Sequence, residues 1–345
     1  MTRATRPARG LAILSPANFG MVMATGIVSL AAHFLQRQGV AHTLFLLNNV
    51  LYALLCVLTV LRVVRYPGAF FSDMFSYALG PGFFTFVAGT SVLAAQHIIM
   101  MAHWQVGFVF WGLGIVAWVA LTYTVFVAII IKENKPTLDK GINGGWLLAV
   151  VATQSIAVVS SLLAPVTGHE HRLELNFVAL SMWLWGGMLY IWMMSLIFYR
   201  YTFFRMSPGD LAPPYWINMG AMAISTLAGV LLIDNAPDAP YLLSLLPFLK
   251  GFTIFYWATA TWWIPMLMIL GIWRHLWKRF PLTYDPLYWG AVFPLGMYTV
   301  CTLRMAQVMD LPFLDGIARI FFPIAVVAWS ATFVGLLRHT KRHLR

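Results

Sequence analysis

The sequence predicts an all-α polytopic membrane protein, and three observations lead to this fold class. Hydrophobic residues make up 61% of the 345 residues and charged residues only 10%, whereas soluble domains hold about 45–50% and about 25%. Apolar segments close to the roughly 20 residues that a membrane-spanning helix needs recur along the whole chain. In addition, 17 of the 22 Lys and Arg residues fall in alternate connecting segments and tails. Cytoplasmic loops carry such an excess, so both termini are expected in the cytoplasm, on the inner face of the plasma membrane.

Ten membrane spans are predicted within a single transmembrane domain that covers residues 1–345. In chain order they are 17–35, 43–61, 77–97, 104–131, 144–164, 175–199, 215–233, 248–273, 286–307 and 312–337. Basic segments at 1–14 and 338–345 form the cytoplasmic ends. The first span is too long for a cleavable signal and nine more follow it.

Odd-numbered and even-numbered spans differ in composition. Eleven of the 15 Trp residues lie in the even spans, and amphipathic aromatic rings suit the boundary with lipid. We therefore expect the even spans to form an outer layer.

Each odd span instead carries a stripe of polar or small residues spaced by three, four or seven, which is one face of a helix. Close packing between helices explains such a stripe on any single span. Five alternating spans with the same feature favour an inner ring around a polar path, built from five inner–outer hairpins. The stripes are Asn18, Thr25, Ser29 and His33; Gly82, Thr85, Gly89 and Gln96; Asn143, Gln154, Ala157 and Ser161; Asn218, Ser225 and Gly229; and Phe293, Gly296, Arg304 and Gln307.

The span 286–307 places a bulky Phe293 directly before Pro294. Because proline has no amide hydrogen, the carbonyl of Gly290 loses its helical partner, and such a break is tolerated at membrane depth only beside protein or a water-filled cavity. The segment fits either an ordinary kinked helix with a packing phenylalanine or a break beside a cavity, with Gly290 and Gly296 leaving room around the ring. Eleven residues later, Arg304 shares the face of Phe293 on a straight helix. It either attracts anions at an outer mouth or anchors the helix at the interface, paired with Asp310.

Several functional classes are disfavoured. All 11 Asp and Glu residues fall in loops or at span ends, whereas proton-driven carriers and cation pathways use buried carboxylates. A path of hydroxyls, amides and backbone dipoles suits an anion. The basic charges are spread over many loops, which argues against nucleic acid. No catalytic motif, cofactor site or metal site is expected; His169-Glu170-His171 offers only two histidines in a loop.

Four motifs resemble one known family, over about residues 14–335. They begin at Ser15 (SPANFGMVMATG), Gly144 (GGWLL), Pro214 (PYWINMG) and Trp289 (WGAVFPLG). The chain is similar to the tellurite-resistance/C4-dicarboxylate transporter family, which includes bacterial tellurite-resistance channels, plant slow anion channels and fungal malate and sulfite transporters.

The resemblance implies ten transmembrane helices as five hairpins in quasi-fivefold order, with the odd helices lining a central pore, and a homotrimer in the lipid membrane with one pore in each protomer. It implies transport of small anions, either a C4-dicarboxylate such as malate or sulfite-, chloride- or nitrate-like ions. A proton-coupled C4-dicarboxylate carrier or a sulfite exporter is the alternative. Phe293 and Pro294 would form the pore gate. The expected pore-lining residues are Asn18, Thr25, Ser29, Thr85, Gly89, Gln154, Ser161, Asn218, Ser225, Gly296 and Arg304.

Overall fold

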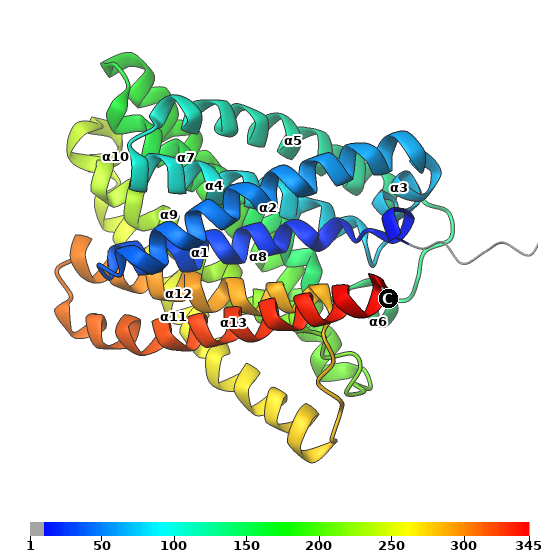
Figure 1. The fold of residues 1–345 in the computed structure, drawn as a ribbon. Helices are drawn as coiled ribbons and strands as arrows, with labels where there is room; N and C mark the ends of the chain where they lie inside the picture. Colours follow the sequence, from blue (N-terminus) through cyan, green and yellow to red (C-terminus); the bar gives the residue numbers. More distant parts are fainter. Residues whose placement is uncertain (1–9, 345) are drawn as a thin grey trace, which may run out of the picture.

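The computed structural model describes residues 10–344, and within them it contains helices and no strands. The basic residues Arg3, Arg6, Arg9 and Arg345 lie outside this range. The long helices run roughly alongside one another, with short helices at the two ends of the bundle (Figure 1). The α-helices are α1 (Gly20–Phe34), α2 (Gln38–Arg65), α3 (Pro67–Met74), α4 (Phe84–Met101), α5 (Trp104–Ile131), α6 (Leu138–Gly141), α7 (Leu148–Leu163), α8 (His169–Phe203), α9 (Ile217–Asn235), α10 (Pro240–Ser244), α11 (Leu246–Ile272), α12 (Trp289–Val308) and α13 (Asp315–Leu344).

Five helices form a closed inner ring. In the order α1, α4, α7, α9 and α12 each packs on the next, and α12 packs on α1. The helices α2, α5, α8, α11 and α13 pack against these five in turn, so every hairpin has one inner and one outer member. Between 72% and 94% of the apolar window of α1, α4, α7 and α9 is buried, against 6% to 50% for the outer five. The predicted two-layer arrangement is confirmed.

Nine helical segments in the described part of the chain are long and apolar enough to cross a membrane. The inner helix α12 is not among them, although it has 20 residues and 15 of these are buried. Arg304, Gln307, Pro294 and two glycines lower its hydropathy. Since α12 closes the ring between α9 and α1, we retain a tenth span as a prediction.

The observed helices extend beyond several predicted spans. The predicted span 43–61 is part of α2, Gln38–Arg65, and 175–199 is part of α8, His169–Phe203. Apolar composition marks only the part of a helix that suits lipid. Polar residues continue the same helix past it, because the backbone hydrogen bonds do not depend on hydropathy.

Every inner helix begins with a 3-10 turn, and the starts of these turns recur every 64 to 73 residues. Four of the five turns have proline in their first two positions, where its missing amide hydrogen would have no helical partner in any case. The structure thus reveals a fivefold repeat that the sequence does not display. The turns are Pro16–Phe19, Gly80–Phe83, Gly144–Leu147, Pro213–Trp216 and Pro286–Tyr288.

A second repeated feature lies at this same end of the bundle. In four hairpins a basic residue at or just after the end of the outer helix donates a hydrogen bond to a backbone carbonyl shortly before its own inner helix. Charged donors make the stronger hydrogen bonds, so these contacts hold the segments that lead into four of the inner helices. The pairs are Arg62 with Ala12 (3.1 Å), Lys132 with Phe75 (3.2 Å), Arg200 with Ile142 (2.7 Å) and Arg274 with Leu211.

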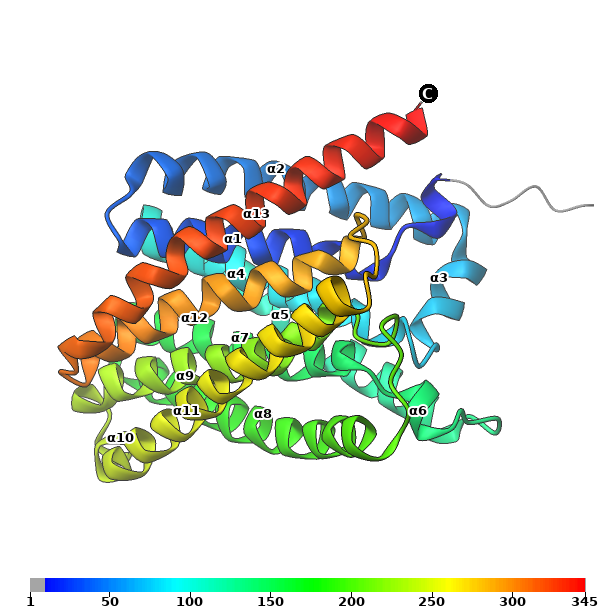
Figure 2. The same ribbon diagram turned by 90° about the horizontal axis from the view of Figure 1, so that it is seen from below.

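Side chains of each outer helix also bond to the inner helix of the following hairpin. Figure 2 shows α13 crossing over α12 and α1, and the indole of Trp329 on α13 donates to the Thr25 hydroxyl on α1 at 3.0 Å. This bond joins the last hairpin to the first and closes the ring. The other bonds are Tyr52 with Thr90 (2.9 Å), Trp111 with Ser160 (2.8 Å), Trp118 with Thr153 (2.8 Å), Trp183 with the Ser225 carbonyl (2.8 Å) and Trp257 with Thr302 (3.0 Å).

The expectation that the outer-layer tryptophans face lipid is therefore only partly right. Trp192 and Trp262 are each 51% exposed, whereas Trp183 is 0% exposed and Trp118 9%. A buried indole needs an acceptor for its N–H. The hydroxyls and carbonyls of the neighbouring inner helix provide one.

Candidate functional site

A cavity of about 160 Å³ lies within the inner ring, toward the end of the bundle where the inner helices finish. Because the five inner helices form a closed ring and all five line this cavity, it lies on the ring axis. We call it the vestibule. Its lining consists of Leu30 and Phe34, Ala95 and Ile99, Val158 and Leu162, Leu227 and Leu231, and Arg304.

Among the residues that the structure describes, Arg304 is the only charged one that lines the vestibule. Its guanidinium donates to a carboxylate oxygen of Asp234 at 3.1 Å and to the amide oxygen of Gln307 at 3.0 Å. It also lies 5.6 Å from the ring centroid of Phe34. The partner is thus Asp234 on α9 rather than Asp310, which follows the end of α12 with a left-handed φ of 57°.

Phe293 lies deeper in the ring than Arg304. Residues 289–308 form one α-helix despite the internal proline. An 11-residue separation therefore places Phe293 about 16 Å further along the axis and within about 20° of the same face. Its side chain is 0% exposed.

Two close contacts identify the helices that pack against α12 at the depth of Phe293. A Cβ added to Gly220 of α9 would lie 2.7 Å from the Pro294 ring, and one added to Gly296 would lie 2.8 Å from Ile27 of α1. Gly220 and Ile27 each precede a vestibule residue by seven positions, which is about two helical turns. The expectation that Gly296 leaves free space is wrong: this glycine lets α12 approach α1 closely.

Four of the predicted pore-lining residues form a side-chain hydrogen bond with an outer helix, while the amide oxygens of Gln154 and Asn218 are buried without a hydrogen-bond partner among the described residues. Besides Thr25, which accepts from Trp329, Ser29 donates to the Ala41 carbonyl of α2 at 2.7 Å. Gln154 donates to the Trp183 carbonyl of α8 at 3.0 Å, and Asn218 donates to the Tyr201 hydroxyl of α8 at 3.1 Å. These bonds are what the packing explanation of the polar stripes predicts, and a pore role for the four stays a prediction.

The other stripe residues lie at helix–helix contacts or within their own helix. Thr85 donates to the Pro16 and Gly82 carbonyls, and Ser225 donates to the Ala221 carbonyl. Gly89 lies against Phe19 and Val22 of the first hairpin. Among the described residues the Ser161 hydroxyl is buried without a hydrogen-bond partner. Of the whole predicted set, Arg304 alone lines the vestibule.

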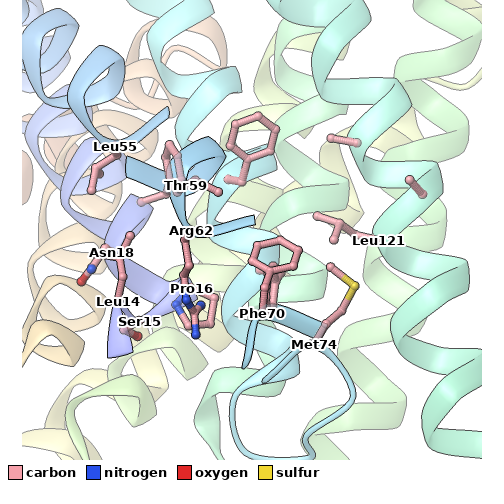
Figure 3. A pocket seen from close by; sticks show the side chains of 15 residues that line it. Leu14, Ser15, Pro16, Asn18, Leu55, Thr59, Arg62, Phe70, Met74 and Leu121 are labelled. Atoms are coloured by element: carbon pink, nitrogen blue, oxygen red, sulfur yellow. The ribbon is translucent and has the colours of Figure 1, made fainter. Parts of the chain in front are cut away.

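Asn18 lines a different cavity, which lies outside the ring. This cavity of about 250 Å³ lies between α2, α3, α4, α5 and the segment before α1. Figure 3 shows Asn18 and Arg62 among its otherwise mainly apolar lining. Of the five ring helices only α4 lines this cavity, so it is separate from the vestibule.

The apolar lining of the vestibule was missed by sequence reasoning. On four inner helices it is a pair of apolar residues four positions apart, such as Leu30 and Phe34 or Leu227 and Leu231. This spacing is one helical face, but it is also the spacing of ordinary core packing. Only the closure of the ring distinguishes the two.

No group of three or more His, Cys, Asp or Glu side chains that could hold a metal occurs among the described residues. His171 instead pairs with Glu174 at 3.1 Å, and both side chains are 74% exposed. The described site is therefore one of apolar and small residues with a single arginine.

Comparison with known proteins matches this architecture to one group. A family model described as voltage-dependent anion channel, SLAC1, matches residues 14–337. An uncharacterized transporter of Methanocaldococcus jannaschii is 25% identical over 324 residues, 92% of each chain. The sulfite efflux pump SSU1 of Trichophyton rubrum is 25% identical over 344 residues, 92% of this chain and 88% of the pump. An uncharacterized membrane protein of Mycobacterium tuberculosis strain H37Rv is 38% identical over 151 residues, 44% of this chain and 76% of that protein.

Proposed function

Because the chain belongs to the voltage-dependent anion channel (SLAC1) family, we propose that it carries small anions along the axis of its inner ring and that Phe293 gates this path. The protein is an anion transporter of the membrane. The vestibule carries the proposal: all five inner helices line it, and its only charged residue is cationic. An arginine beside low-dielectric walls raises the local concentration of anions.

The gate proposal rests on the position of Phe293 below the vestibule. Its ring is fully buried, and an apolar constriction blocks ions by excluding water. In the proposed mechanism an anion enters at Arg304, loses part of its hydration in the vestibule, and passes when the ring of Phe293 moves aside. No carboxylate lies in the middle of an inner helix in the described part of the chain, so none opposes the anion once it has passed the vestibule.

Phe293→Ala tests the gate, and Phe84→Ala is the matched control. Phe84 lies at the start of α4, is 1% exposed, and packs toward Phe126 of α5 with 6.1 Å between ring centroids. Both truncations are expected to cost about 3–5 kcal/mol of stability by soluble-protein precedent. Only Phe293→Ala should raise anion current per folded protein in a reconstituted bilayer. A current equal to or below wild type would reject the gate.

The relatives named as sulfite efflux pumps make sulfite the first anion to test, with malate, chloride and nitrate beside it. Proteoliposome flux across this panel identifies the substrate. Ohmic current indicates a channel, whereas saturable flux that depends on a proton gradient indicates the coupled carrier.

We further propose a homotrimer joined through outer-helix surfaces, with the inner-helix starts on the cytoplasmic side. Helix α5 presents an apolar stripe of period seven, Val109, Val116, Tyr123 and Ile130, whose residues are 64% to 70% exposed. Such a stripe suits lipid or a neighbouring protomer. A stable monomer by mass measurement in nanodiscs would contradict the trimer, and labelling of loop cysteines from outside would test the orientation.

A further inference from the structure

Beside the vestibule lies an open groove of about 570 Å³ between α9, α11 and α12. It is lined by Asp234, Lys250, Arg304 and Gln307 together with Ile233, Pro237, Leu246 and Val308. Arg304 is the one residue that lines both the groove and the vestibule. Its side chain therefore stands at the boundary between the two spaces.

The groove already holds one carboxylate, that of Asp234. An oxygen of this side chain lies 3.1 Å from one terminal nitrogen of Arg304, while Gln307 accepts from the other. The side chain of Arg304 is 22% exposed and that of Asp234 50%. An ion pair this exposed is weak and screened by salt, so an anion from solution competes with the Asp234 carboxylate for the guanidinium.

We propose that the groove is an anion-recruitment site for carboxylates and oxyanions, formed by Arg304 and Lys250, in which Asp234 is a resident competing anion that limits access to the vestibule. Guanidinium is well suited to carboxylate and oxyanion acceptors, and a second cation adds to the attraction. The inference rests on the proposed function, because it concerns entry to the same path.

The charges set the expected consequence. Lys250, Arg304 and Asp234 together carry a net charge of +1, and neutralising Asp234 raises it to +2. Asp234→Asn keeps a side chain of the same shape and an acceptor oxygen for Arg304 while it removes the competing charge. A doubly charged anion gains more from this change than a singly charged one.

Asp238→Asn is the matched control. Asp238 lies four residues further along and forms the other ion pair of this region, with Arg172 at 3.4 Å, but it lines neither the groove nor the vestibule. Its neutralisation changes the net charge of the protein by the same amount. It therefore separates a local effect at Arg304 from a general change in surface potential.

Two measurements are made on the purified full-length protein, with sodium sulfite and sodium malate as probes. The first is the anion concentration that raises the unfolding temperature by a fixed amount, since a ligand of the folded state at free concentration L stabilises it by RT ln(1 + L/Kd). The second is anion flux into proteoliposomes at low ionic strength. In Asp234→Asn we expect the same stabilisation at about tenfold lower anion concentration and about tenfold faster flux, at the low end of what focused potentials produce. Both gains should disappear in Asp234→Asn/Arg304→Ala and shrink at high salt.

An equal response of Asp234→Asn and Asp238→Asn, or a gain that persists without Arg304, overturns the inference. Tighter anion binding in Asp234→Asn with no flux in any variant, Phe293→Ala included, supports the recruitment site and rejects the proposed transport function.

Discussion

A single methyl group at Gly220 should disturb the helix that carries Phe293. In Gly220→Ala the new Cβ would lie 2.7 Å from Cγ, 3.1 Å from Cβ and 3.3 Å from Cα of Pro294. The proline ring cannot rotate away, because it is fused to the backbone. Favourable carbon–carbon contacts begin at about 3.5 Å, so α12 must move from α9 by roughly 0.8 Å at this level.

The expected cost is about 1–3 kcal/mol, which is typical of an overpacked core. Because Phe293 is the neighbour of Pro294 and moves with it, the resting anion current should also rise, though less than in Phe293→Ala. Gly112→Ala on the outer helix α5 is the control, since nothing lies within 4 Å of its added Cβ. That variant should be unchanged or gain up to about 1 kcal/mol from helix propensity.

Unfolding in mixed detergent micelles measures the stability of both variants, and planar bilayers measure their current. If Gly220→Ala matches Gly112→Ala in stability to within about 0.5 kcal/mol and in current, the tight contact between α9 and Pro294 does not hold the gate, and the reasoning fails.

Two further predictions concern the contacts between layers. Trp329→Phe removes the hydrogen bond to Thr25 that joins the last hairpin to the first. We expect the free energy of unfolding in detergent to fall by about 0.6–1.7 kcal/mol. The control Trp192→Phe, at a half-exposed indole, should stay near wild type. Gln154→Met should lower stability by a similar amount but leave anion selectivity in liposome flux unchanged, because the Gln154 amide bonds to α8. A changed anion selectivity would instead support a pore-lining role for Gln154.

The odd–even contrast of the helices could be predicted from the sequence because it is a local property. The composition of a helix, and the spacing of its polar and apolar residues by three and four positions, indicate whether it contacts lipid or protein. That Phe293 and Arg304 share a face could be predicted in the same way, because both lie on one helix and their relative angle follows from helical geometry. The gate role of Phe293 came from the family resemblance and stays a prediction. The helix α12 that carries them is also the inner helix of lowest hydropathy, for the same polar and helix-breaking residues that made it conspicuous.

The function of each polar stripe could not be predicted, because spacing on one helix defines a face and not the neighbour of that face. Thr25, Ser29, Gln154 and Asn218 occupy one face of their helices as expected, yet their bonds go to outer helices. Pairs of apolar residues line the vestibule on the ring axis instead, and their spacing is that of any packed helix.

The sequence by itself determined that this chain lies in a membrane and that its helices alternate between two kinds. It also determined that one inner helix carries Phe293, Pro294 and, about three turns later, Arg304. These are short-range consequences of transferring side chains between water and lipid. Only the tertiary structure decided that the ring closes, through a bond from Trp329 to a threonine 304 residues earlier. It also decided that Arg304 meets Asp234, 70 residues away along the chain. Such partners are set by how the five hairpins pack together, which no spacing within a single helix contains.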